Sequence, residues 1–122
     1  MKLTNTQIYN YSAALNAEFN NCNIKLPVKV NFFLQKNIQT LQMFFKEIEE
    51  ARINIAKSYG EYDAENNVFN FPPEKIALAQ KDLEELFVIE QEVQIRTFKL
   101  DDFADIELTY KQMSALMFMI EE

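Results

Sequence analysis

Histidine is absent from this 122-residue chain, and its absence excludes much of the chemistry that enzymes use. Histidine is the usual general base near neutral pH, the middle member of the Ser-His-Asp triad and a ligand in most zinc sites. Catalysis here would have to rely on carboxylates, lysine and tyrosine. We therefore expect a protein that is not an enzyme and that has no metal site and no cofactor.

Cysteine and glycine each occur only once. Cys22 lacks a second cysteine for an intramolecular disulfide, which is typical of a reducing compartment, and no histidine is present to activate its thiol. We expect Cys22 to be structural or incidental. A chain with a single glycine also cannot build a glycine-rich phosphate-binding loop.

Long apolar runs are missing as well. No stretch approaches the ~20 apolar residues that span a bilayer, and the polar residues after Lys2 are not those of a signal peptide. The composition, 48% hydrophobic and 25% charged with three prolines, is typical of one folded domain with little linker. We expect a single cytoplasmic domain, residues 1–122, with no membrane contact.

The first half of the chain predicts two helices. Thr4 and Gln7 have the spacing of a capping box, and apolar residues then recur at helical spacing until an asparagine-rich segment at 20–23. A second helix should begin at Pro27 and run to residue 59, where Gly60 ends it. One face of that helix alternates spacings of four and three through Leu34, Ile38, Leu41, Phe45, Ile48, Arg52, Ile55 and Tyr59.

A third helix is predicted over residues 73–90, because Pro73 favours a first turn and the same spacing continues. Two long helices joined by a short connection favour an antiparallel hairpin. Arg52 and Glu90 fall on the facing sides, and we hypothesise that they form an ion pair that fixes the register. The residues expected to be buried between the helices are Phe45, Ile48 and Leu83.

The connection between these helices predicts a small β-hairpin. Residues 61–64 and 68–71 flank the turn sequence Glu-Asn-Asn, and Tyr62, Phe69 and Phe71 should lean on the helices or on a partner because an isolated hairpin is only marginally stable. Oxygen-bearing side chains alternate around this turn as at the start of a calcium loop. The sixth position, which needs glycine, is valine, so we interpret the segment as a turn.

Beyond residue 90 the hydrophobic period changes. A period of two predicts a strand over 93–100, followed by a turn at 101–105 and a short second strand around 106–108. Thr109 and Gln112 form another capping box, which opens a helix extending to residue 122. The fold class is thus mainly α (α+β): a long antiparallel helical hairpin with an extra N-terminal helix, a small antiparallel β element and a C-terminal helix.

Charge is distributed unevenly along the chain. Residues 1–46 hold five lysines against one glutamate, a balance of +4, whereas residues 47–122 carry a balance of −11. Two readings stay open: solvated helix faces that keep the protein soluble, or oppositely charged ends that meet an acidic partner or a second copy. Lys25, Lys29 and Lys36 lie beside two phenylalanines, but a pI near 4.6 and two arginines argue against nucleic-acid binding.

The final predicted helix is apolar on opposing sides, which suggests a contact between subunits. Phe118 and Met119 lie opposite the face that holds Met113. We expect a homo-oligomer, with a two-fold dimer favoured because it is the commonest closed arrangement. The candidate interface residues are Phe118, Met119, Met113, Tyr62, Phe69, Phe71, Lys29 and Lys36.

Three segments resemble small accessory proteins of tailed phages and prophages: LPVKVNFFLQKN, IAKSYGEYD and FKLDDFADIELTYKQMSALMFMI. The resemblance covers most of the chain and assigns no chemical role to any residue. It implies a phage-encoded binding protein in the bacterial host cytoplasm that inhibits or sequesters a host anti-phage defence protein or its small signalling ligand. The alternative that it implies is a protein of virion assembly or structure.

Overall fold

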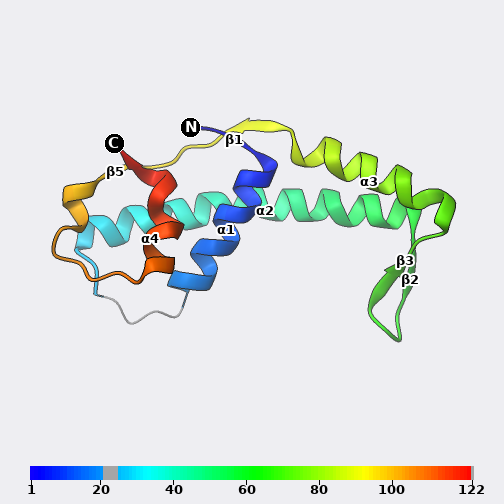
Figure 1. The fold of residues 1–122 in the computed structure, drawn as a ribbon, viewed down its shortest axis with the longest axis horizontal. Helices are drawn as coiled ribbons and strands as arrows, with labels where there is room; N and C mark the ends of the chain where they lie inside the picture. Colours follow the sequence, from blue (N-terminus) through cyan, green and yellow to red (C-terminus); the bar gives the residue numbers. More distant parts are fainter. Residues whose placement is uncertain (21–24, 122) are drawn as a thin grey trace.

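The computed structural model describes residues 1–20 and 25–121. Helix α2, Val28–Tyr59, runs the length of an elongated molecule (Figure 1). Helix α1, Asn5–Phe19, packs against the first half of α2, and the short helix α4, Tyr110–Leu116, packs against α1. Helix α3, Pro73–Phe87, lies alongside the second half of α2. The predicted mainly α fold with a long antiparallel helical hairpin is confirmed. Cys22 and most of the predicted asparagine turn lie outside the described residues.

Helix α1, Asn5–Phe19, begins as predicted, because the Thr4 hydroxyl accepts from Gln7 N and the Gln7 side chain accepts from Thr4 N. Strand β1, Lys2–Thr4, precedes it and pairs antiparallel with β4, Glu90–Glu92. This pairing between the start of the chain and residues 90–92 was not predicted. Since residues 90–92 form this strand, helix α3, Pro73–Phe87, ends three residues before the predicted residue 90.

The predicted ion pair between Arg52 and Glu90 is wrong. Glu90 lies in β4, where its carboxylate is 3.2 Å from Lys2 Nζ. Arg52 pairs with Glu49, one turn earlier on α2. The heptad spacing continues in the sequence as far as Glu90, but the helix itself ends at Phe87 with Val88 as its C-cap.

The predicted β-hairpin is confirmed: β2, Glu61–Asp63, pairs antiparallel with β3, Val68–Asn70. Its turn is held by the Asp63 carboxylate, which accepts from Glu65 N at 3.0 Å and from Asn66 Nδ2 at 2.8 Å. Asn67 takes a positive φ of 53°, which asparagine tolerates better than most residues. The calcium-like spacing of oxygens therefore serves the turn itself.

The C-terminal segment differs from the prediction. Strand β5, Phe98–Lys99, pairs in parallel with β6, Ile120–Glu121, and the expected antiparallel strand around 106–108 does not form. Ile120 pairs with Phe98 of β5, at the position where the expected strand would have paired. The final helix is correspondingly short: α4, Tyr110–Leu116, passes into the 3₁₀ turn η2, Met117–Met119, and another 3₁₀ turn, η1, spans Leu100–Phe103.

The core lies where α1, α4 and the 93–103 segment cover the first half of α2. Asn37 is fully buried there, and its side chain bonds both backbone groups of Arg96: Nδ2 donates to the carbonyl at 2.9 Å and Oδ1 accepts from N at 2.8 Å. The fully buried apolar side chains around it are Ile8, Leu15, Leu34, Leu41, Val93, Phe98, Leu116 and Met119.

Of the three residues expected to be buried in the helical hairpin, Ile48 is buried and the other two, Phe45 and Leu83, are only half-buried. At Leu83 the two-helix layer lacks a third element on one side, and the side chain lines a hollow. Phe45 lies nearer the body, where its ring packs against Tyr9 of α1. The prediction of full burial is therefore wrong for Phe45 and Leu83.

This packing predicts unequal truncation effects. Ile48→Ala should lower the free energy of unfolding by roughly 2 to 5 kcal/mol, as a buried core truncation does. Leu83→Ala should cost less, about 1 kcal/mol, because its side chain is only partly buried and lines a hollow. Urea unfolding followed by circular dichroism measures both, and equal losses would contradict the difference in packing.

Candidate binding site

Residues 49–87 form an extension that we call the distal arm. It contains the last three turns of α2, the β2–β3 hairpin and α3, and it projects beyond the body of the molecule (Figure 1). Within this range Ala79 is the one residue whose side chain is buried. An antiparallel pair of amphipathic helices normally needs further elements to cover its apolar faces. The distal arm is therefore the part of the described chain with the least internal packing.

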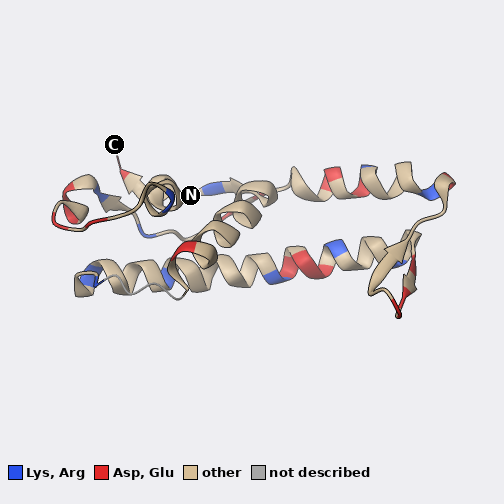
Figure 2. Cartoon of the chain, turned by 60° about the horizontal axis from the view of Figure 1, so that its bottom comes forward, with Lys and Arg blue, Asp and Glu red and all other residues tan. Residues whose placement is uncertain are grey.

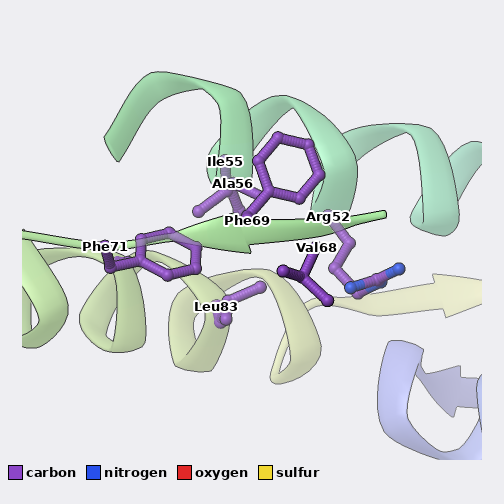
Figure 3. Close-up of a pocket in the computed structure, with 8 residues that line it drawn as sticks. Arg52, Ile55, Ala56, Val68, Phe69, Phe71 and Leu83 are labelled. Carbon is purple, nitrogen blue, oxygen red and sulfur yellow. The ribbon is translucent and has the colours of Figure 1, made fainter. Parts of the chain in front are cut away.

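Strand β3 crosses the space between α2 and α3 and leaves a hollow of about 320 Å³ beneath it (Figure 3). Figure 3 shows Arg52 at one end of this apolar hollow and Phe71 at the other, with Leu83 rising from α3. Apart from Arg52 the lining is entirely aliphatic or aromatic: Ile55, Ala56, Val68, Phe69, Phe71, Ala79 and Leu83. A hollow of this size and chemistry can receive one or two large apolar side chains.

Gly60 sets the position of the hairpin over the hollow. A Cβ at residue 60 would lie 2.9 Å from Phe71 Cε1 and 3.0 Å from the carbonyl oxygen of Ala56. Any other residue would therefore push the Phe71 ring away from the end of α2. On the hairpin itself, Tyr62 and Phe69 face each other across the strands with ring centroids 5.3 Å apart.

The Arg52 guanidinium is held by Glu49, at the base of the distal arm, and Glu49 is in turn held by Tyr9 of α1. Arg52 Nε donates to Glu49 Oε1 at 3.1 Å, Nη2 donates to the same oxygen, and the Tyr9 hydroxyl donates to Glu49 Oε2 at 3.1 Å. The ring of Tyr9 stacks on Phe45 at 4.5 Å and meets Phe87 edge-on. These contacts tie the distal arm to α1.

This network shifts the pKa of each member. The hydrogen bond from Arg52 lowers the pKa of the Glu49 carboxyl, although partial burial opposes the shift. The same hydrogen bond raises the pKa of Arg52. Burial, followed by the bond to Glu49, raises the pKa of the Tyr9 hydroxyl. Glu49 is therefore a stable anion at neutral pH, and it neutralises the one charged group that lines the apolar hollow.

A second, wider hollow of about 760 Å³ lies beside the first and shares Arg52, Ala56 and Phe69 with it. Its remaining lining is more polar and consists of Ile53, Lys57, Tyr62 and Asn67. Two cations and two aromatic rings in one hollow suit an aromatic anion. The charge around it does not, because residues 49–87 hold nine acidic against four basic side chains.

The structure divides the predicted interface residues into three places. Tyr62, Phe69 and Phe71 lie together on the distal arm, and each contributes to one or both hollows. Lys29 and Lys36 are exposed at the other end of α2. The remaining three, Met113, Phe118 and Met119, belong to the C-terminal segment.

Met119 cannot take part in the predicted apolar contact between subunits, whereas the role expected of Phe118 stays a prediction. Met119 is fully buried within the chain, where its sulfur lies 3.5 Å from Asn37 Nδ2. Phe118 stacks on Tyr11 of α1 with ring centroids 4.0 Å apart. The helix ends at Leu116, so these residues do not occupy the helical positions from which opposing apolar sides were inferred. Met113 is half-buried.

Several lining residues were not recognised as binding residues from the sequence. Arg52 was placed between the helices as a structural charge, and Ile55 and Leu83 as ordinary core positions. Their spacing in the sequence is that of residues in a helical core. Because no third helix covers this side of α2 and α3, part of that core is left as a hollow. Val68, on β3, is 47% exposed beside them.

Among the described residues, no group of three cysteine, aspartate or glutamate side chains is close enough together to hold a metal ion. No helix in that part of the chain is both long and apolar enough to cross a bilayer. Comparison of the chain with protein-family models, with curated proteins and with solved structures finds no match.

The Glu49 contacts predict a specific dependence of stability on pH. A carboxylate whose pKa is lower in the folded state stabilises the fold above its unfolded pKa, and this contribution is lost as pH falls through the folded pKa. Glu49→Gln should reduce the loss of stability on acidification below about pH 4.3. Because Arg52 is partly exposed, the pair is worth at most about 1 kcal/mol. Urea unfolding across pH measures this, with Glu47→Gln as the exposed control.

Proposed function

We propose that this protein is a non-enzymatic binding protein that holds apolar side chains of a partner protein in the apolar hollow of the distal arm. The observation that carries the proposal is the hollow of about 320 Å³, lined by seven apolar residues on the least packed part of the chain. Interfaces draw most of their binding energy from a few large side chains seated in such pockets. Burying one such side chain contributes roughly 1.5 to 3 kcal/mol.

A protein partner fits the distal arm better than a small anionic signalling ligand. The acidic excess over residues 49–87 repels phosphate groups, and Glu49 already neutralises Arg52. An apolar side chain pays no such electrostatic cost. The peptide to which it belongs can use the free N–H groups of Arg52 as donors to a carbonyl oxygen.

The resemblance to phage accessory proteins supports a role in the cytoplasm of an infected bacterium, where the partner is a host anti-phage defence protein that the chain inhibits or sequesters. Binding through one preformed hollow needs no catalysis and no cofactor, which agrees with the absence of histidine. Virion assembly is the alternative role, and it calls for partners among capsid or tail proteins.

Two variants that fill the apolar hollow test this proposal. Ala56→Phe and Val68→Trp place a large side chain where the partner's would sit, whereas Ala77→Trp adds the same bulk to an exposed position of α3 outside the lining. Tagged protein is purified from bacteria during phage infection, and partners are quantified by mass spectrometry. The filled variants should lose at least ten-fold in recovery of a partner that wild type and Ala77→Trp retain.

Thermal unfolding shows whether each variant is folded. Undiminished recovery with a folded Ala56→Phe protein would exclude the apolar hollow as the binding site. Recovery of capsid or tail proteins, in place of a host protein, would favour the assembly role.

A further inference from the structure

Helix α2 has an exposed side that points away from α1 and α3, and between residues 28 and 46 this side is both apolar and basic. The buried residues of the helix, from Val30 to Ile48, lie on the opposite side. Val28 is 87% exposed, Phe32 56% and Met43 70%. Three exposed lysines lie among them, and we call the whole set the outer stripe: Val28, Lys29, Phe32, Lys36, Met43 and Lys46.

Phe32, the one aromatic ring of the outer stripe, is exposed but supported. Its ring meets Phe33 edge-on with centroids 6.0 Å apart, and the Phe33 ring lies 6.1 Å from that of the buried Phe98. Lys36 Nζ lies 5.7 Å from the centroid of the Phe32 ring. A side chain that is already held in one position loses little conformational freedom when a partner covers it. Phe32 is therefore suited to anchor a contact.

The positive charge of the outer stripe has no counterion within the described part of the chain. Residues 25–46 contain four lysines and no acidic residue, and none of the lysines in the outer stripe forms an ion pair there. Figure 2 shows that α2 carries only basic side chains up to Lys46, with acidic ones beginning after it. The outer stripe therefore attracts carboxylates, although the net charge of the chain is −7.

The order of residues around the helix matches one kind of partner. With about 3.6 residues per turn, Phe32 and Met43 lie along the middle of the outer stripe, Lys29 and Lys36 on one side of them, and Lys46 on the other. Paired helices use the same arrangement, with apolar residues at the seam and charged residues flanking it. We propose that the outer stripe binds an amphipathic helix of a partner protein, in which carboxylates flank the apolar residues.

A partner helix fits this surface better than a flat anionic membrane does. Figures 1 and 2 show the β2–β3 hairpin projecting from the end of α2 away from α3, on the side of the outer stripe. Residues 61–70 of this hairpin contain three acidic and no basic side chains. A flat anionic surface against the outer stripe would also meet these carboxylates and be repelled, whereas a helix lying over residues 28–46 would not reach them.

This inference is independent of the proposed function. No residue of the outer stripe lines either hollow of the distal arm. Loss of binding in the apolar hollow would therefore leave the outer stripe intact, and the reverse also holds.

Two labelled synthetic peptides of about three heptads test the charge of the partner helix. Both carry leucine at the seam positions, with glutamate at the flanking positions of the acidic peptide and lysine at those of the basic peptide. Fluorescence anisotropy in dilute salt should show the acidic peptide binding wild-type protein at least about ten-fold more tightly than the basic peptide. The net charge of −7 would favour the basic peptide at other surfaces, so this preference would be specific.

Charge reversal should invert the preference. Lys29→Glu with Lys36→Glu should bind the basic peptide more tightly than the acidic one, because the flanking charges of the outer stripe are then negative. The control is Lys99→Glu with Lys111→Glu, which makes the same change in net charge at exposed positions outside the outer stripe and should keep the wild-type preference. High salt should weaken the acidic complex, because exposed charges are screened beyond ~8 Å at physiological ionic strength.

Removal of the anchor ring is the second arm of the test. Phe32→Ser should weaken binding of the acidic peptide about ten-fold, as loss of a central aromatic contact does. Tyr110→Ser removes a ring that is 87% exposed outside the outer stripe, and it should keep wild-type affinity. Circular dichroism shows that each variant is folded.

Three outcomes would overturn the proposal. The first is a wild-type protein that does not prefer the acidic peptide, and the second is a preference that survives reversal of Lys29 and Lys36. The third is binding to phosphatidylserine vesicles that this reversal abolishes, without any binding of the acidic peptide, which would indicate a membrane surface instead.

Discussion

The length of α2 is the constraint on which the rest of the structure depends. At ~1.5 Å per residue its 32 residues extend for about 48 Å, more than the remaining elements cover. Asn37 fixes the first half of this helix in the body, since its side chain bonds both backbone groups of Arg96 and so holds the chain leading into β5. The second half has only α3 and the hairpin beside it, and the hollows follow from that shortage of neighbours.

The connection between body and distal arm is correspondingly specific. Strand β1 pairs with β4 just beyond the end of α3, and Asn5 Nδ2 donates to the Leu86 carbonyl at 2.8 Å. Tyr9 reaches Glu49, which in turn holds Arg52. These contacts anchor the base of the distal arm while its outer two turns receive little cover. Rigid attachment combined with open apolar surface is what a preformed binding site requires, because less conformational freedom is lost when a partner binds.

Local signals in the sequence were sufficient for most of the helices. The capping boxes at Thr4 and Thr109, the start of α2 after Pro27 and its end at Gly60 were all predicted, because each depends on residues within one or two turns. The pairings of β1 with β4 and of β5 with β6 were not, because they join segments about ninety and twenty residues apart through strands of two or three residues. Strands this short carry no periodic signal. Because Glu90 lies in strand β4 and not in the helix, it cannot form the predicted ion pair with Arg52.

The candidate site was predictable only in part, for the same reason. The aromatic residues of the hairpin stood out because a short hairpin cannot bury them, whereas Ile55 and Leu83 looked like ordinary core residues. The central claim is that the distal arm has the least internal packing of the described chain. Amide hydrogen exchange tests this directly, since local opening requires less free energy where few apolar contacts exist. Amides of α3 and of residues 52–59 should exchange faster than those around Asn37 and Leu41. Equal protection along the whole of α2 and α3 would contradict it.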